Sequence, residues 1–259
     1  MNAYVAANPP KSPPDRPIER AFDTVPSMTG KTEADEPVFD EPIVDEAEIA
    51  RAHAQALEDG RLLFAKECDF VMGVAHLDGL PNASYPEIAF AGRSNAGKSS
   101  LLNAVTNRTH LARVSNTPGR TKEINFFLLG DRLMLADLPG YGFARVSKAE
   151  SARWNELIFG YLRGRPSLRR VVFLIDARRG PMASDIEVME LLDKAAVSYQ
   201  LVLTKADKLR PVEFAATHAN TLAEAARHTA AHPEILATSS LSGFGIPELR
   251  AALTALATW

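Results

Sequence analysis

The stretch AFAGRSNAGKSSLLNAV, residues 89–105, joins a short apolar segment to a second apolar segment with helical spacing. It contains the pattern G-x4-G-K-S, formed by Gly92, Gly97, Lys98 and Ser99. Glycines in such a turn let backbone N–H groups curl around a polyphosphate, and a helix N-terminus favours the negative charge. Lys98 would then reach the β- and γ-phosphates, and the Ser99 hydroxyl would bind Mg²⁺. A chance glycine-rich turn is the alternative, but the strand–loop–helix setting favours a phosphate loop.

A second motif, DLPG at residues 137–140, ends a predicted strand. Asp137 can reach the metal through water, and the Gly140 N–H can contact a γ-phosphate, although a plain strand-ending turn fits the same letters. The preceding segment SNTPGRTKE, residues 115–123, is polar and rich in turn formers. Its Thr121 is the candidate for a second hydroxyl on Mg²⁺. We expect this segment to become ordered around a γ-phosphate, as switch loops do.

A third motif, TKAD at residues 204–207, lies where another strand is expected to end. The Asp207 carboxylate can accept hydrogen bonds from guanine N1–H and from its exocyclic amine, a donor pair that adenine lacks. The stem of Lys205 can lie over the base, and residues 238–240 (TSS) can offer backbone N–H groups to guanine O6. A lone K-x-D equally fits a charged loop end. Following two phosphate motifs, it predicts a guanine site.

Short apolar runs alternate with helical patterns through most of the chain. Strands are expected over 87–92, 124–129, 132–137, 170–176, 199–207 (running into a loop) and 234–240, and helices over 98–105, 147–164, 184–196, 211–229 and 245–258. This alternation predicts an α/β fold of three layers, with a mostly parallel six-stranded sheet and helices on both faces. In such sheets ligands bind beyond the carboxyl ends of the strands.

The first part of the chain differs in composition from the rest. Residues 1–50 contain 11 Asp and Glu against 4 Lys and Arg, and 8 of the 17 prolines. We expect residues 1–60 to be an acidic, proline-rich and largely disordered extension, with a helix over 45–59 capped by Asp45 and ended by Gly60. No signal peptide or membrane span is evident, and a single cysteine excludes an intrachain disulfide, so a cytoplasmic location is expected.

The motifs occur in the order G-x4-G-K-S, Thr, D-x-P-G, T-K-x-D and S-S, which resembles a translation-factor-type GTPase domain. More narrowly, EIAFAGRSNAGKSSLLNAV, NTPGRTKEINFF, LADLPGYGFARV and LVLTKADKL resemble the YihA/EngB family of bacterial GTPases. The resemblance covers residues 61–259 as an EngB-type P-loop GTPase domain. It implies binding of GTP and GDP and slow Mg²⁺-dependent hydrolysis. It also implies association with the large ribosomal subunit or its precursor during assembly, and a requirement in cell division and septation.

The resemblance also assigns roles to single residues. Catalysis would rest on Lys98, Thr121, Gly140 and Asn95, and Mg²⁺ on Ser99, Thr121 and Asp137. The expected nucleotide contacts are Gly92, Arg93, Ser94, Asn95, Ala96, Gly97, Lys98, Ser99, Gly119, Arg120, Thr121, Lys122, Glu123, Asp137, Leu138, Pro139, Gly140, Thr204, Lys205, Ala206, Asp207, Thr238, Ser239 and Ser240.

Three positions set the expected chemistry apart from that of many GTPases. Tyr141 stands where they carry a Gln that orients the attacking water, so weak intrinsic hydrolysis is expected. Asn95 matches an Asn that helps to hold K⁺ beside the phosphates in related GTPases, where the cation can supply positive charge. Thr204 replaces an Asn that often begins the base motif, which removes an amide tether.

The segment from Arg108 to Arg179 contains 14 Lys and Arg against 6 Asp and Glu. Arginine suits phosphate, so contact with rRNA that depends on the bound nucleotide is expected, against the alternative of an ordinary solvated surface. A monomer without DNA or membrane partners is expected. Two other functions stay open: a nucleotide kinase or ATPase, which leaves Lys205 and Asp207 unexplained, and a GTP-dependent structural module in septation without a direct ribosomal role.

Overall fold

A computed structural model describes residues 45–109, 111–112, 123–141 and 148–258 of the chain, with side chains from residue 156 onward in the last range. The contacts between residues divide the chain into two units, residues 1–43 and 44–259. The architecture below is that of the second unit.

The centre of the fold is a sheet whose seven described strands follow the order β1-β3-β4-β2-β5-β6-β7. Their bounds are β1 Cys68–Val74, β2 Glu87–Gly92, β3 Ile124–Leu129, β4 Leu133–Asp137, β5 Leu168–Asp176, β6 Tyr199–Thr204 and β7 Leu236–Ala237. Strands β4, β2, β5, β6 and β7 are parallel, and β3 is antiparallel to both of its neighbours. The mostly parallel sheet is confirmed. A turn at Gly130 and Asp131 joins β3 to β4, with both residues at positive φ.

The expected count of six strands was one too few, because the sequence pattern did not reveal β1. Within the part of the chain that the structure describes, this strand pairs with β3 alone at the edge of the sheet, and its five inner residues are exposed. Its apolar residues Phe70, Val71 and Met72 are exposed, so this edge strand differs from the strands of a parallel sheet, which are buried on both faces. At the opposite edge, β7 has only two residues, although a strand over 234–240 was expected.

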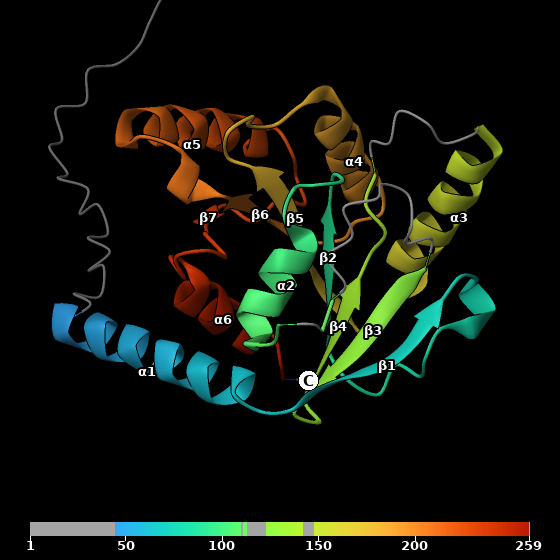
Figure 1. Ribbon diagram of the computed structural model, residues 1–259, viewed down its shortest axis with the longest axis horizontal. Coiled ribbons are helices and arrows are strands. Elements are labelled where there is room, and N and C mark those ends of the chain that lie inside the picture. The colour runs from blue at the N-terminus through green and yellow to red at the C-terminus, as the bar shows by residue number, and fades with distance from the viewer. Residues whose placement is uncertain (1–44, 110, 113–122, 142–147, 259) are drawn as a thin grey trace, which may run out of the picture. The chain divides into compact units, whose positions relative to one another are not determined.

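The helices are α1 Glu46–Phe64, α2 Lys98–Thr106, α3 Lys148–Gly164, α4 Ala183–Lys194, α5 Pro211–Ala225 and α6 Ile246–Thr254, with short 3-10 helices η1 Leu77–Gly79 and η2 Ala206–Lys208. One hydrophobic cluster unites the sheet with α3, α4 and α5, and a second unites it with α1, α2 and α6. Helices therefore cover both faces of the sheet, as expected (Figure 1). Among the described residues, no helix is long and apolar enough to cross a membrane.

The helix expected over 45–59 forms, but it continues beyond Gly60 to Phe64. Asp45 caps it as expected, since its carboxylate accepts the Ala47 N–H at 3.0 Å. Gly60 is a site of close approach to α6, because a Cβ atom there would lie 2.8 Å from the Ala251 nitrogen. Helix α1 thus packs on α6, and we propose that the folded domain begins with α1 and not at residue 61.

Candidate functional site

The expected site residues meet at one edge of the sheet, because parallel strands bring their carboxyl ends together. Strand β2 ends at Gly92, β4 at Asp137, β5 at Asp176 and β6 at Thr204. The phosphate, D-x-P-G and base motifs follow three of these four ends.

The phosphate loop connects β2 to α2 in a strained, glycine-dependent conformation. Gly97 caps α2 at φ 97°, and Asn95 also has a positive φ of 65°. A Cβ atom at Gly92 would lie 3.0 Å from that of Leu174 on β5, so only glycine fits without displacement. The loop presents the N-terminus of α2 toward the strand ends, which is the arrangement that binds phosphate groups.

Lys98 and Asp137 lie together at the centre of this edge. The Lys98 ammonium forms an ion pair with the Asp137 carboxylate, and the two side chains are only 11% and 7% exposed. Ser99 follows Lys98 in the first turn of α2 and is half-buried. A hydroxyl and one carboxylate beside a phosphate site suit Mg²⁺, which prefers oxygen ligands and keeps several waters. Within the described ranges, no group of three His, Cys, Asp or Glu side chains offers a metal site of another kind.

The D-x-P-G motif contacts the phosphate loop through its backbone. The Leu138 N–H donates to the Phe90 carbonyl at 3.0 Å, which extends the β2–β4 pairing. A Cβ atom at Gly140 would lie 3.3 Å from the Ser94 nitrogen, so a side chain there would crowd the loop. Ser94 in turn donates its N–H to the Tyr141 carbonyl at 3.0 Å. Pro139, between these contacts, is buried.

The base motif is tied to the phosphate loop across more than a hundred residues of sequence. The Thr204 hydroxyl donates to the Ala96 carbonyl at 2.5 Å, and the Lys205 ammonium donates to the Asn95 carbonyl at 2.6 Å. Thr204 offers no amide at this position, and its hydroxyl forms a different tether to the phosphate loop. Lys205 adopts a positive φ of 58°, which turns the chain at the end of β6.

Neighbouring side chains donate hydrogen bonds to the Asp207 carboxylate and favour its ionised form. A hydrogen bond from the Ser239 side chain, followed by one from Lys208, lowers the pKa of the Asp207 carboxyl. The Ser239 hydroxyl also accepts the N–H groups of Leu241 and Ser242 at 3.3 and 3.2 Å. Because the Ala206 N–H donates to the Thr238 carbonyl at 3.1 Å, the TSS segment lies directly beside the base motif. Ser240 continues this segment and is exposed.

The remaining expected site residues belong to the segment that leads into β3, which begins at this edge because Asn125 pairs with Asp137. Glu123 lies with its carboxylate against Gly73 of β1. Residues Gly119, Arg120, Thr121 and Lys122, with the rest of 115–122, lie outside the described residues. Their roles remain predictions.

Asp176, at the end of β5, is a site residue that the motifs did not reveal. It is 9% exposed, and it accepts hydrogen bonds from the Arg178 guanidinium at 2.6 and 2.9 Å and from the Lys205 ammonium at 2.9 Å. It therefore fixes the lysine that is expected to lie over the base. The rule that strand ends carry site residues would have found it, because Asp176 ends the apolar strand RVVFLID.

Replacing Asp176 by Asn should make folding stability less dependent on pH. Burial acts to raise its pKa, but hydrogen bonds from Arg178 and Lys205 outweigh this and lower the pKa from 3.8 to about 2. Since the lowered pKa belongs to the folded state, the stabilisation is present above pH 4 and lost as the pH falls toward 2. After allowance for solvent around Arg178, it should amount to about 1 kcal/mol.

Urea unfolding of wild type and Asp176→Asn between pH 2 and 6 measures this difference. Glu190→Gln, which removes a carboxylate from an exposed pair with Lys194, is the control. A wild-type advantage of the same size at pH 2 and pH 6 would contradict the assignment.

The fold and this edge together define a P-loop GTPase, with a phosphate loop, a D-x-P-G motif whose Asp137 pairs with Lys98, and a T-K-x-D motif on one α/β sheet. Residues 87–205 match the family model described as "50S ribosome-binding GTPase". The chain belongs to the EngB family of GTP-binding proteins. It is 57% identical over 227 residues to the "Probable GTP-binding protein EngB" of Rhodospirillum rubrum, covering 86% of this chain and 96% of that protein. It is 56% identical over 201 residues to that of Gluconobacter oxydans, covering 78% and 88%.

Solved structures agree on the fold. The crystal structure of a probable GTP-binding protein engB has a TM-score of 0.51 at 23% identity, covering 66% of this chain and 98% of that one. Era in complex with MgGDPNP and a segment of 16S ribosomal RNA has a TM-score of 0.53 at 21% identity, covering 66% and 56%. The predicted family, fold class and GTPase activity are thus confirmed.

Proposed function

We propose that this GTPase is a switch in the assembly of the large ribosomal subunit, and that normal cell division and septation require it through that role. The observation that carries the proposal is the match to a ribosome-binding GTPase family over residues 87–205, a range that includes the phosphate loop and reaches into the base motif. In this proposal the GTP form docks on a pre-ribosomal particle, and hydrolysis releases it. The protein would act as a cytoplasmic monomer.

The chemistry of hydrolysis would rest on positioning and charge. Lys98 and the phosphate loop would bind the polyphosphate, with Ser99, Thr121 and, through water, Asp137 holding Mg²⁺. The metal would neutralise charge on the transferred phosphoryl group. Asn95, exposed at the turn of the loop, would help to hold K⁺. Turnover would be slow, since the residue after Gly140 carries no carboxamide.

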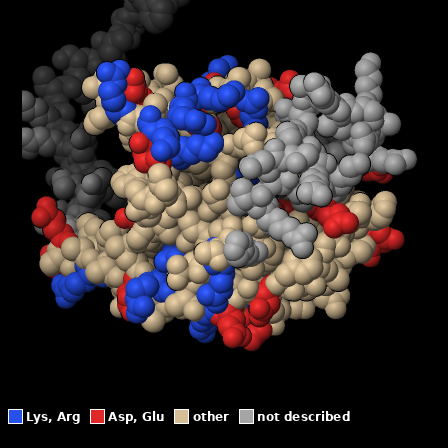
Figure 2. Space-filling model, viewed as in Figure 1, with Lys and Arg blue, Asp and Glu red and all other residues tan. Residues whose placement is uncertain are grey.

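The surface near the nucleotide edge supports contact with RNA. Figure 2 shows Lys and Arg side chains gathered at the top of the face in view, over the loop between β5 and α4. Arg178 and Arg179 lie in this loop and are exposed. Arginine binds phosphate by paired hydrogen bonds, and since Arg178 already forms such a pair with Asp176, Arg179 is the side chain that suits an RNA backbone beside the nucleotide site.

Co-sedimentation with purified large subunits tests the proposal. We expect strong binding with a non-hydrolysable GTP analogue, at least about tenfold weaker binding with GDP, and a fall in affinity as salt rises. Small subunits serve as the control. Equal binding in both nucleotide states would refute the switch. GTP-dependent sedimentation without ribosomes would instead support the alternative of a structural module in septation.

A further inference from the structure

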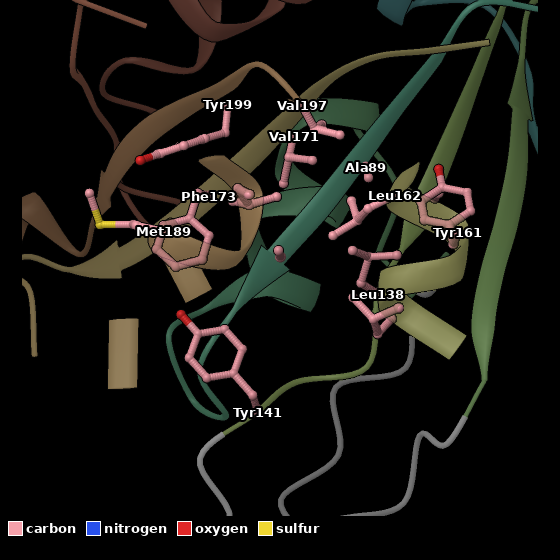
Figure 3. Packing of buried hydrophobic residues seen from close by; sticks show 14 of the residues in the cluster. Ala89, Leu138, Tyr141, Tyr161, Leu162, Val171, Phe173, Met189, Val197 and Tyr199 are labelled. Atoms are coloured by element: carbon pink, nitrogen blue, oxygen red, sulfur yellow. The ribbon is translucent and has the colours of Figure 1, made fainter. Parts of the chain in front are cut away.

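Tyr141, the residue directly after the D-x-P-G motif, points into the core and away from the surface. It is 8% exposed, and its ring stacks on Phe173 of β5 with centroids 6.0 Å apart and an angle of 10° between the planes. Figure 3 shows the side chain entering the cluster beside Phe173, at the point where the described chain stops. Its hydroxyl donates to the Asp185 carboxylate at 2.8 Å. Burial, and then the charge of Asp185, raise the pKa of this hydroxyl, so it stays a donor.

Asp185 connects this hydrogen bond to the beginning of α4. It is 2% exposed, and its second carboxylate oxygen accepts the Met182 N–H at 2.9 Å, which caps the helix. One buried carboxylate therefore serves both the cap of α4 and the tyrosine. Loss of either donor would leave this buried carboxylate partly unsatisfied and would destabilise the fold. The two hydrogen bonds therefore hold both donors in fixed positions.

The backbone of Tyr141 connects this buried hydrogen bond to the phosphate loop. Its carbonyl accepts the Ser94 N–H of the phosphate loop, and a parallel bridge pairs it with Arg93. At Gly140, one residue earlier, a Cβ atom would lie 3.3 Å from the Ser94 nitrogen, so the two backbone segments lie close together. We infer that Tyr141 and Asp185 are positioning residues for GTP hydrolysis: their buried hydrogen bond anchors the D-x-P-G motif to α4 and holds Gly140 against the phosphate loop.

This anchoring of Gly140 would stabilise the transition state of GTP hydrolysis. The Gly140 N–H is the group expected to contact the γ-phosphate, whose position changes most during hydrolysis, while GDP makes no such contact. A group that is fixed in advance stabilises the transition state without reorganisation. Loosening it should lower kcat and leave the binding of GDP unchanged. The inference concerns turnover of GTP without a partner, so it stands or falls independently of the ribosomal role.

Tyr141→Phe tests this inference, because it keeps the ring and its stacking and removes only the hydroxyl. Tyr161→Phe is a matched control. Tyr161 is fully buried in the same cluster, and its hydroxyl donates to the Glu87 carboxylate at 3.1 Å, but Glu87 begins β2 at the opposite end of the strand. Single-turnover phosphate release, GDP affinity and thermal unfolding are measured for both variants.

We expect Tyr141→Phe to hydrolyse GTP about five- to tenfold more slowly, with GDP affinity within about twofold of wild type. Tyr161→Phe should lose similar stability and keep the wild-type rate. Asp185→Asn should act in the same direction, and the double variant should be no slower than the slower single variant. An unchanged rate in folded Tyr141→Phe, or an equal loss of rate in Tyr161→Phe, would overturn the inference.

Discussion

Lys98→Met should bind GTP about 100-fold more weakly than wild type, since the ammonium makes charge-assisted hydrogen bonds to two phosphates. The same substitution should lower the free energy of unfolding by about 3 kcal/mol in the absence of nucleotide, because it leaves the buried Asp137 carboxylate without its partner. Both effects come from one side chain, and they can be separated. Titration of a fluorescent GTP analogue measures the first, and urea unfolding the second.

The double variant Lys98→Met/Asp137→Asn separates the effect on GTP binding from the effect on stability. Removing both charges should restore most of the stability, because no buried charge is left unpaired, yet GTP binding should stay weak. Lys194→Met, which removes an exposed lysine of α4, should change neither quantity. Binding of GTP by folded Lys98→Met within threefold of wild type would show that Lys98 serves only the ion pair.

The sequence was sufficient for those parts of the fold and site that depend on local pattern. Strands β2, β3 and β5 and the phosphate loop were predictable because each has its own apolar run or glycine spacing. The position of the guanine motif followed from the strand that precedes it. Each of these features depends on residues that are neighbours in sequence, and those residues determine the backbone conformation of their own segment.

Contacts between distant segments were not predictable in the same way. Gly60 was expected to end a helix, because glycine often does so. Its close approach to Ala251 of α6 leaves no sign in the neighbouring residues of the sequence. The hydroxyl of Thr204 reaches a carbonyl 108 residues away, and Tyr141 reaches Asp185 across 44 residues. Only the topology of the sheet brings these pairs together. Sequence pattern predicted the residues of the candidate site, whereas the network that holds the described ones in place depends on tertiary packing.

Asp207→Asn should exchange the base preference of the site. The Asp207 carboxylate, whose pKa is lowered by Ser239 and Lys208, is ionised at neutral pH and accepts both N1–H and the exocyclic amine of guanine. An Asn side chain places a donor where guanine also presents one. GTP affinity should therefore fall about 100-fold or more, because paired donors in a recognition site are left unsatisfied. Xanthine carries an oxygen in place of the exocyclic amine, so the variant should prefer xanthosine triphosphate.

Competition of GTP, ATP and xanthosine triphosphate for a labelled nucleotide measures this preference in wild type and variant. Glu213→Gln is the matched control, since it removes a nearby carboxylate that pairs with Arg210 at the start of α5 and should leave the preference for GTP intact. If ATP competes as well as GTP for the wild type, or if Asp207→Asn still prefers GTP, then Asp207 does not read the base. The hydrogen bond from Ser239 would in that case serve only the turn between β7 and α6.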